Sequence, residues 1–207
     1  MVDYNLVSAL VGLILSDGYL NRNNKNSDYR MSFTFKVWDK ERNCSMMEFN
    51  NWLKFEVLKK ICTSKELNLY PKDKPRQCTF NTKNWDWFTS IYPNFYNTIN
   101  DKTIKIIPNK VFLQCYFTSR SLAFMIMGDG YWDKEQQTVY ICTECFKLED
   151  LHNLIYILRH KLKLVVTTKK RNNGFRLRFS SKKLNIKLLR EITQEHFHPL
   201  MLYRLGL

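Results

Sequence analysis

Two long apolar runs stand out in the pattern of hydrophobic and polar positions along the chain. One covers residues 10–15 and the other residues 122–127, and each is followed by a small residue, an aspartate, a glycine and a tyrosine. An apolar run with no polar face is typical of a helix that is buried on nearly all sides. We therefore expect one buried helix over residues 3–17 and a second that starts near residue 118. Their first turns can be capped by Asp3 or Asn5 in the first helix and by Thr118 or Ser119 in the second.

The carboxylates that end these runs stand in an unfavourable place. Asp17 and Asp129 lie where a helix C-terminus carries partial negative charge, and burial makes an unpaired charge costly. A single aspartate in this position could simply end a core helix beside a glycine cap. Two of them, at the same place in two similar runs, indicate a site that binds a cation.

Residues 29–37 alternate between apolar and polar side chains, which predicts a β-strand. The polar face of this strand mixes cations with hydroxyls. That combination suits phosphates and base edges, although a strand face that only meets solvent has the same pattern. The polar face consists of Arg30, Ser32, Thr34 and Lys36.

Apolar residues at helical spacing predict two amphipathic helices that cover the sheet, over residues 39–60 and 85–98. Two short extended segments lie between them, at residues 67–70 and 78–81, and the turn that separates them contains Arg76. The polar residues 19–28 are interpreted as a loop or hairpin tip, and residues 102–108 as a connector.

The second half repeats this order of elements. Residues 131–137 are polar and residues 138–146 are strand-like. A helix is expected over residues 148–162, a hairpin around the turn at Asn173-Gly174, and a final helix over residues 182–195. The hairpin carries the densest group of cations in the chain: Lys169, Lys170, Arg171, Arg176 and Arg178.

The charge of the chain indicates a polyanionic partner. The 207 residues carry 33 Lys and Arg against 19 Asp and Glu, a net charge of +14, while 44% of residues are hydrophobic, which is typical of a folded protein. A membrane surface is the competing partner, but the cations are spread along the chain and no apolar run approaches the roughly 20 residues needed to span a bilayer. We therefore expect a soluble protein with no membrane partner.

The six cysteines do not have the density of a disulfide scaffold, and the N-terminus does not resemble a secretory signal. Cys142 and Cys145 form one C-x-x-C pair, but a structural zinc site needs a second pair of ligands. His196 and His198, near a proline in the tail, also lack further ligands, so we expect them to have structural roles or to contact phosphate.

The chain resembles single-chain LAGLIDADG homing endonucleases. The resemblance rests on the two motifs, whose aspartates Asp17 and Asp129 lie 112 residues apart, and on the repeated unit that follows each motif. The resemblance implies an α+β fold of two pseudo-two-fold-related αββαββα half-domains, with motif helices at the centre and curved antiparallel sheets forming a DNA-binding saddle. The expected halves are residues 1–100 and 118–207, joined by residues 101–117. The position of Gly12 in the first motif is occupied by Phe124 in the second, although closely packed helices prefer small residues. We therefore expect Ala123 and Gly128 to allow the two motif helices to approach each other closely.

The resemblance also implies a site for divalent metal. Asp17 and Asp129 would hold Mg²⁺ or Mn²⁺, with the backbone carbonyls of Ser16 and Gly128 as further ligands. A basic residue would stand near each scissile phosphate, and the matching positions hold Lys105 and Arg204. Arginine stabilises phosphate charge but does not readily relay a proton, because its pKa lies above about 12.

The expected function is therefore that of a monomeric endonuclease that cuts both strands of a long, near-unique double-stranded DNA site. Two alternatives remain open. One is an RNA maturase that assists intron splicing without DNA cleavage, and the other is a DNA-binding regulator without metal dependence. Frequent Lys, Asn, Phe and Tyr would fit an organelle genome, in a mitochondrion or chloroplast. The expected DNA-binding residues are Arg30, Ser32, Thr34, Lys36, Arg76, Lys169, Lys170, Arg171, Arg176 and Arg178.

Overall fold

The computed structural model describes residues 3–207, and the chain forms two compact units. The inserted unit comprises residues 17–92. The terminal unit combines the chain up to Ser16 with residues 93–207. This grouping cuts across the repeat in the sequence, because the first motif helix belongs with the second half of the chain. The boundaries expected from the repeat, at residues 100 and 118, stay a prediction.

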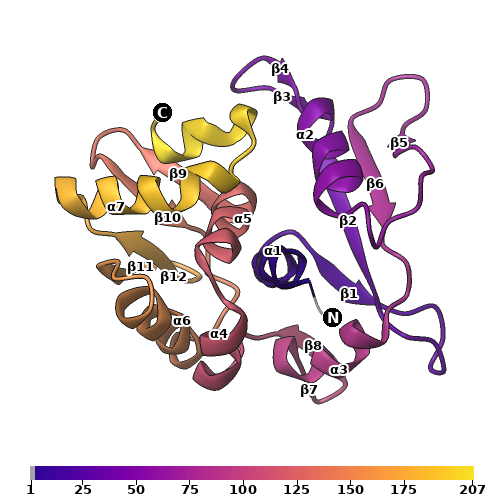
Figure 1. The fold of residues 1–207 in the computed structure, drawn as a ribbon, viewed down its shortest axis with the longest axis horizontal. Helices are drawn as coiled ribbons and strands as arrows, with labels where there is room; N and C mark the ends of the chain where they lie inside the picture. The colour runs from indigo at the N-terminus through magenta and orange to yellow at the C-terminus, as the bar shows by residue number, and fades with distance from the viewer. Residues whose placement is uncertain (1–2) are drawn as a thin grey trace. The chain divides into compact units, whose positions relative to one another are not determined.

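The two buried motif helices are present in the terminal unit. Helix α1 (Tyr4–Leu15) begins at Asp3, whose carboxylate accepts hydrogen bonds from the backbone N–H groups of residues 5 and 6. Helix α5 (Ser119–Asp129) begins at Thr118, which forms a reciprocal capping box with Ser121. The two helices pack side by side (Figure 1). Helix α1 ends two residues earlier than expected, at Leu15.

The same order of elements follows each motif helix. Each repeat forms an antiparallel four-stranded sheet, and the strand orders β1-β2-β6-β5 and β9-β10-β12-β11 are equivalent. The α+β fold with two αββαββα repeats is therefore confirmed. The first repeat continues with β1 (Tyr19–Asn21), β2 (Arg30–Lys36), α2 (Met47–Trp52), β5 (Asn68–Tyr70), β6 (Gln77–Asn81) and α3 (Asp86–Phe95). The second continues with β9 (Gly130–Asp133), β10 (Thr138–Ile141), α6 (Leu148–His160), β11 (Val166–Arg171), β12 (Gly174–Phe179) and α7 (Lys183–Thr193).

The first covering helix is much shorter than the helix predicted over residues 39–60. Asp39 accepts hydrogen bonds from the backbone N–H groups of Glu41 and Arg42, which forms a turn between the short strands β3 (Trp38–Asp39) and β4 (Cys44–Ser45). The helix starts only at Met47 and continues as a π-helical turn, Leu53–Val57. A local side-chain bond thus competes successfully with helix formation at this point.

Four further segments differ from the sequence interpretation. The polar segments 19–28 and 131–137 each contain a strand, β1 and β9, that pairs with the strand after it. The helix expected over residues 85–98 ends at Phe95, and strand β7 (Tyr96–Ile99) then pairs with β8 (Lys102–Lys105). The connector therefore contains a strand, and a short helix, α4 (Lys110–Tyr116), follows it.

Each unit has its own core on the helix-covered face of its sheet. In the inserted unit, Met31, Phe33 and Phe80 are almost completely buried, and the Phe33 and Phe80 rings stack 4.8 Å apart. In the terminal unit, Leu177 and Phe179 of β12 are fully buried. The chain ends in a 3₁₀ helix, Pro199–Leu205. Within residues 3–207, none of the helices is long and apolar enough to cross a membrane.

Candidate metal site and nucleic-acid interface

Helices α1 and α5 approach each other most closely at Gly12. A Cβ atom at this position would lie 2.1 Å from the backbone oxygen of Ser121 and 3.0 Å from Cβ of Phe124. The Ser121 hydroxyl also donates a hydrogen bond to the backbone oxygen of Ser8, at 2.7 Å. The close approach therefore depends on Gly12 and Ser121. The contribution expected from Ala123 and Gly128 stays a prediction.

The first motif helix ends against Lys105. Ser16 follows the helix, and its hydroxyl donates to the backbone oxygen of Gly12 at 3.0 Å. The Lys105 ammonium donates to the backbone oxygen of Ser16 at 3.0 Å. Lys105 is the last residue of β8, so the β7–β8 hairpin brings a cation to the negative end of α1.

The second motif helix ends against Arg204 in the same manner. Nη1 of Arg204 donates to the backbone oxygens of Gly128 and Gly130, both at 2.6 Å, and also to that of Ile126 at 3.3 Å. Arg204 belongs to the terminal 3₁₀ helix, and its Nε donates to the Tyr203 hydroxyl at 3.0 Å. In both motifs, then, a cation binds the carbonyl of the residue that precedes the aspartate.

The oxygen donors of the two motifs are of the chemical kind that binds a divalent metal of the Mg²⁺ type. Asp17 is exposed, Asp129 is half-buried, and the carbonyls of Ser16 and Gly128 are the neighbouring oxygen donors in the chain. Among residues 3–207, no group of three or more His, Cys, Asp or Glu side chains could hold a metal ion. Mg²⁺ is usually held by one or two carboxylates together with water and substrate phosphates, so one carboxylate per motif is a suitable protein contribution.

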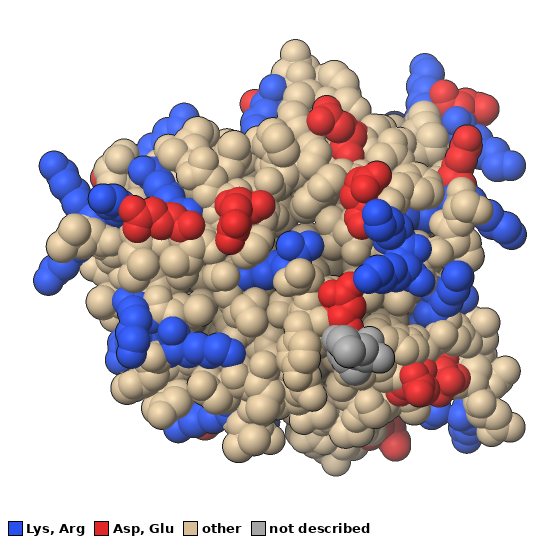
Figure 2. Space-filling model, viewed as in Figure 1, with Lys and Arg blue, Asp and Glu red and all other residues tan. Residues whose placement is uncertain are grey.

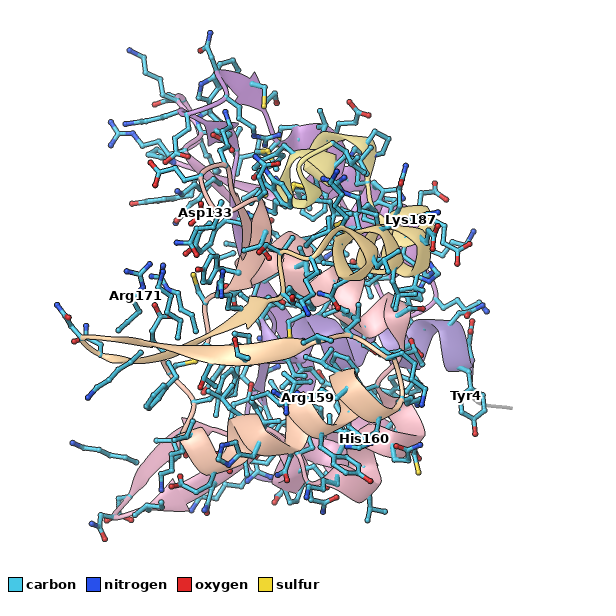
Figure 3. The ribbon with its side chains drawn as sticks, turned by 90° about the vertical axis from the view of Figure 1, so that its left-hand side faces the viewer. Tyr4, Asp133, Arg159, His160, Arg171 and Lys187 are labelled. Atoms are coloured by element: carbon cyan, nitrogen blue, oxygen red, sulfur yellow. The ribbon has the colours of Figure 1, made fainter. Side chains whose placement is uncertain are left out.

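One face of the terminal unit's sheet is polar and basic. The register pairs Tyr140 of β10 with Tyr131 of β9 and with Arg178 of β12, and it pairs Lys169 of β11 with Arg176. Because side chains alternate along a strand, these five residues share one face. Arg171 also belongs to this face and lies at the turn end of the β11–β12 hairpin, away from Lys187 on α7 (Figure 3). Lys170 alternates with Lys169 and Arg171 and lies on the opposite face, with Leu177 and Phe179.

The cations of this face are held by aromatic and acidic neighbours. Nε of Arg176 donates to the Glu144 carboxylate, and Nη1 donates to the Tyr131 hydroxyl at 3.0 Å. Burial alone lowers the pKa of Arg176, but these hydrogen bonds raise that pKa above its usual range. Lys169 donates to the Tyr140 hydroxyl at 3.2 Å, and the Tyr140 ring stacks on Tyr131 with centroids 5.4 Å apart.

Arg178 differs from these held cations. Its Nε is buried and has no hydrogen-bonding partner among the described residues. A buried donor without a partner is costly, so a ligand or water that accepts from Arg178 would stabilise this face.

The corresponding face of the inserted unit contains the four residues expected from the alternation of β2. Asn21 of β1 donates to the Ser32 hydroxyl at 2.8 Å and accepts from Nε of Arg30 at 3.2 Å. Thr34 and Lys36 are exposed on the same face. Arg76 is exposed and directly precedes β6. Sequence reasoning missed the neighbours that the register adds to this face: Tyr19, Asn21, Asn68, Tyr70, Gln77, Thr79 and Asn81.

Basic side chains occur in several groups on the visible face of the molecule, and acidic side chains lie between them (Figure 2). On this face the positive charge is thus distributed, as the sequence indicated. A polyanion would meet it over many separate contacts.

The cysteines and tail histidines have no ligand arrangement. All six cysteines are free thiols, and burial raises the pKa of both Cys142 and Cys145. Nδ1 of His198 accepts from the backbone N–H of Leu200 at 3.3 Å, which is a structural role. Nε2 of His196 lies 3.5 Å from the Ser119 hydroxyl.

Comparison with known proteins places this arrangement in a family. The sequence profile of the LAGLIDADG DNA endonuclease family matches residues 7–186. The chain belongs to the LAGLIDADG DNA endonuclease family. The match includes both motif helices and both sheets, so the resemblance seen in the sequence is confirmed.

Solved structures share the fold. The homing endonuclease I-WcaI bound to its DNA recognition sequence is 22% identical, with a TM-score of 0.75 over 99% of this chain and 87% of that one. I-DmoI with its nicked target DNA in the presence of Mn is 14% identical, with a TM-score of 0.56 over 94% of this chain and 98% of that one. A complex of I-DmoI with DNA and Ca has a TM-score of 0.51.

One relative is named for RNA maturation and not for DNA cleavage. The chain is 28% identical over 217 residues to the cytochrome b mRNA maturase bI2 of Saccharomyces cerevisiae. The match covers 99% of this chain and 48% of the relative, so the chain spans about half the length of that protein.

Proposed function

We propose that the protein is a sequence-specific, double-strand DNA endonuclease that hydrolyses phosphodiester bonds with Mg²⁺ or Mn²⁺. The matched ends of the two motif helices are the observation that carries this proposal. Lys105 and Arg204 each bind the carbonyl that precedes a motif aspartate. Ordinary surface cations would have no reason to take equivalent places in two halves that differ in sequence.

In this mechanism Asp17 and Asp129, with the Ser16 and Gly128 carbonyls, would hold the divalent metal. A divalent metal bound there would supply Lewis-acid chemistry, because it would activate water and stabilise negative charge on the phosphate and the leaving oxygen. Lys105 contributes positive charge and a proton donor on its side of the site. Arg204 contributes charge only.

The polar sheet faces would bind the DNA. Cations on the two faces would neutralise phosphates, and the amide and hydroxyl side chains would contact base edges in the major groove. The two structures with bound target DNA support this assignment, because their folds are similar to that of this chain. We further propose that the protein acts as a monomer, which light scattering would test by a mass of 25.0 kDa.

A cleavage screen against a randomised duplex library tests the proposal. Wild-type protein with Mg²⁺ is expected to enrich the ends of one long cut site, and chelation of the metal is expected to abolish cutting while salt-sensitive binding persists. Asp129→Asn should lower the cleavage rate at least about 1,000-fold and leave the affinity for DNA nearly unchanged. Asp101→Asn, the same change in an exposed turn, is the matched control.

An RNA maturase role is the second candidate, favoured by the similarity to the yeast cytochrome b mRNA maturase. If it holds, the protein accelerates splicing of an intron RNA, and Asp129→Asn leaves that acceleration intact. Absence of DNA cutting by wild-type protein, together with such splicing, would replace the endonuclease proposal. The same relative motivates an organelle as the compartment, which fractionation of cells from the source organism would test.

A further inference from the structure

Arg176 is the most constrained cation on the polar face of the terminal unit. Its side chain is 27% exposed, and that of its ion-pair partner Glu144 is 21% exposed. Glu144 is itself fixed by backbone packing, because a Cβ atom at Gly174 would lie 2.5 Å from the Glu144 backbone oxygen. The adjacent Thr143 is fully buried and donates to the backbone oxygen of Phe175 at 2.7 Å. The carboxylate therefore extends from a rigid loop.

The two partners of Arg176 leave one edge of its guanidinium for a ligand. A guanidinium has five N–H groups. Glu144 accepts from Nε and Tyr131 accepts from one Nη1 hydrogen, while Nη2 has no acceptor among the described residues. One Nη1 hydrogen and the two Nη2 hydrogens of the planar guanidinium fork are therefore left for a ligand. The fork suits two acceptor atoms that lie side by side.

We infer that Arg176, positioned by Glu144 and Tyr131, reads a guanine in the DNA target, an inference that rests on the proposed function. In the major groove guanine presents two neighbouring acceptors, O6 and N7, whereas adenine presents one acceptor and one donor, and cytosine presents a donor. The residues around Arg176 also enclose a polar hollow at the hairpin tip, lined by Glu144, Arg171, Asn172, Asn173 and Arg176.

The carboxylate partner favours a base over a phosphate as the ligand of Arg176. A phosphate also accepts two hydrogen bonds from arginine, but it is attracted mainly by net positive charge. Glu144 offsets that charge and repels a phosphate, while it keeps the fork in one orientation. Arg171, which is exposed at the hairpin tip and forms no ion pair with a carboxylate among residues 3–207, is better suited to phosphate. Arg176 thus contributes to specificity and Arg171 to affinity.

The test measures binding to a selected target and to its single base-pair variants. A duplex selected by wild-type protein from a randomised library is changed at each position in turn, and dissociation constants are measured without divalent metal. Wild-type protein should prefer G·C at one position by about 5- to 150-fold over the other pairs. Arg176→Lys should lose most of this preference at that position only. Glu144→Gln should reduce it at least about threefold at the same position, without change in the melting temperature.

Two further variants separate the possible outcomes. Arg171→Ala should weaken binding to all duplexes by the same factor, and Lys187→Ala, on the exposed surface of α7, should change nothing. Uniform weakening by Arg176→Lys, or an unchanged preference in Glu144→Gln, would overturn the inference and leave the proposed function standing. Failure of wild-type protein to enrich any duplex would overturn both.

Discussion

Replacement of Gly12 by alanine tests whether the close approach of α1 and α5 holds the terminal unit together. In most helix interiors this change is favourable by about 0.8–1.0 kcal/mol, because alanine has the higher helix propensity. Here the new methyl carbon would lie 2.1 Å from the Ser121 backbone oxygen. An ordinary contact between carbon and oxygen is about 3.3 Å or longer, so the helices would have to separate by roughly 1 Å.

The cost of this separation sets the expected magnitude. Overpacking of a core costs typically about 1–3 kcal/mol. The upper end applies because the obstructing atom belongs to the backbone and cannot move to another rotamer. After subtraction of the gain in propensity, the free energy of unfolding should fall by about 2 kcal/mol. For a chain of this size that corresponds to a melting temperature lower by about 4–8 °C.

Thermal unfolding followed by circular dichroism measures the effect. Asn5→Ala is the control, since Asn5 is exposed in the same helix, and its melting temperature should stay within about 2 °C of wild type. An unchanged or raised melting temperature of Gly12→Ala would show that the helices are not packed as described. The separation should also displace the helix ends that carry the Ser16 and Gly128 carbonyls, so DNA cleavage should fall with stability.

Two further predictions concern the basic residues and one histidine. Lys105→Met and Arg204→Met should each lower the cleavage rate about 100-fold, with dissociation constants for DNA within threefold of wild type, because both cations stabilise negative charge at the helix ends. Single-turnover kinetics measures the two rates, and a loss in only one variant would contradict a shared electrostatic role. Burial lowers the pKa of His196 from 6.5, with Glu195 opposing and Arg120 adding to the shift. The unfolded chain therefore binds the proton first as pH falls, and stability should decline below about pH 6.5. Urea denaturation between pH 7 and pH 5 should show this decline in wild type and a weaker one in His196→Gln.

The repeated fold was predictable from the sequence because its signals are local and strong. The apolar runs that end at Asp17 and Asp129 predict buried helices without any knowledge of tertiary contacts. The alternation over residues 29–37 predicts β2 and assigns its polar face correctly. The Asn173-Gly174 signal likewise predicts the hairpin of β11 and β12.

Elements that depend on partners distant in sequence were not predictable in this way. Strand β1 has three residues, too few for a period of two, and it exists because it pairs with β2. The turn at Asp39 is decided by one side chain within a segment whose apolar spacing is helical.

Only part of the candidate site could be predicted from the sequence. Resemblance to a family pointed to Lys105 and Arg204, and the structure places both at the motif helix ends. Their catalytic roles stay a prediction. Glu144 carries no signal in the sequence, since its contact with Arg176 spans 32 positions and depends on how the loop after β10 folds.

The packing of α1 against α5 also determines when the protein can become stable during its synthesis. Ser8 and Ser121 form a hydrogen bond across 113 positions. At translation rates of about 5–20 residues per second, roughly 6–23 seconds pass between the synthesis of these two residues. During that interval the most apolar helix of the chain has been made but its partner has not. The nascent chain must therefore shield α1 by other contacts, and a slowed ribosome would prolong the period in which aggregation competes with folding.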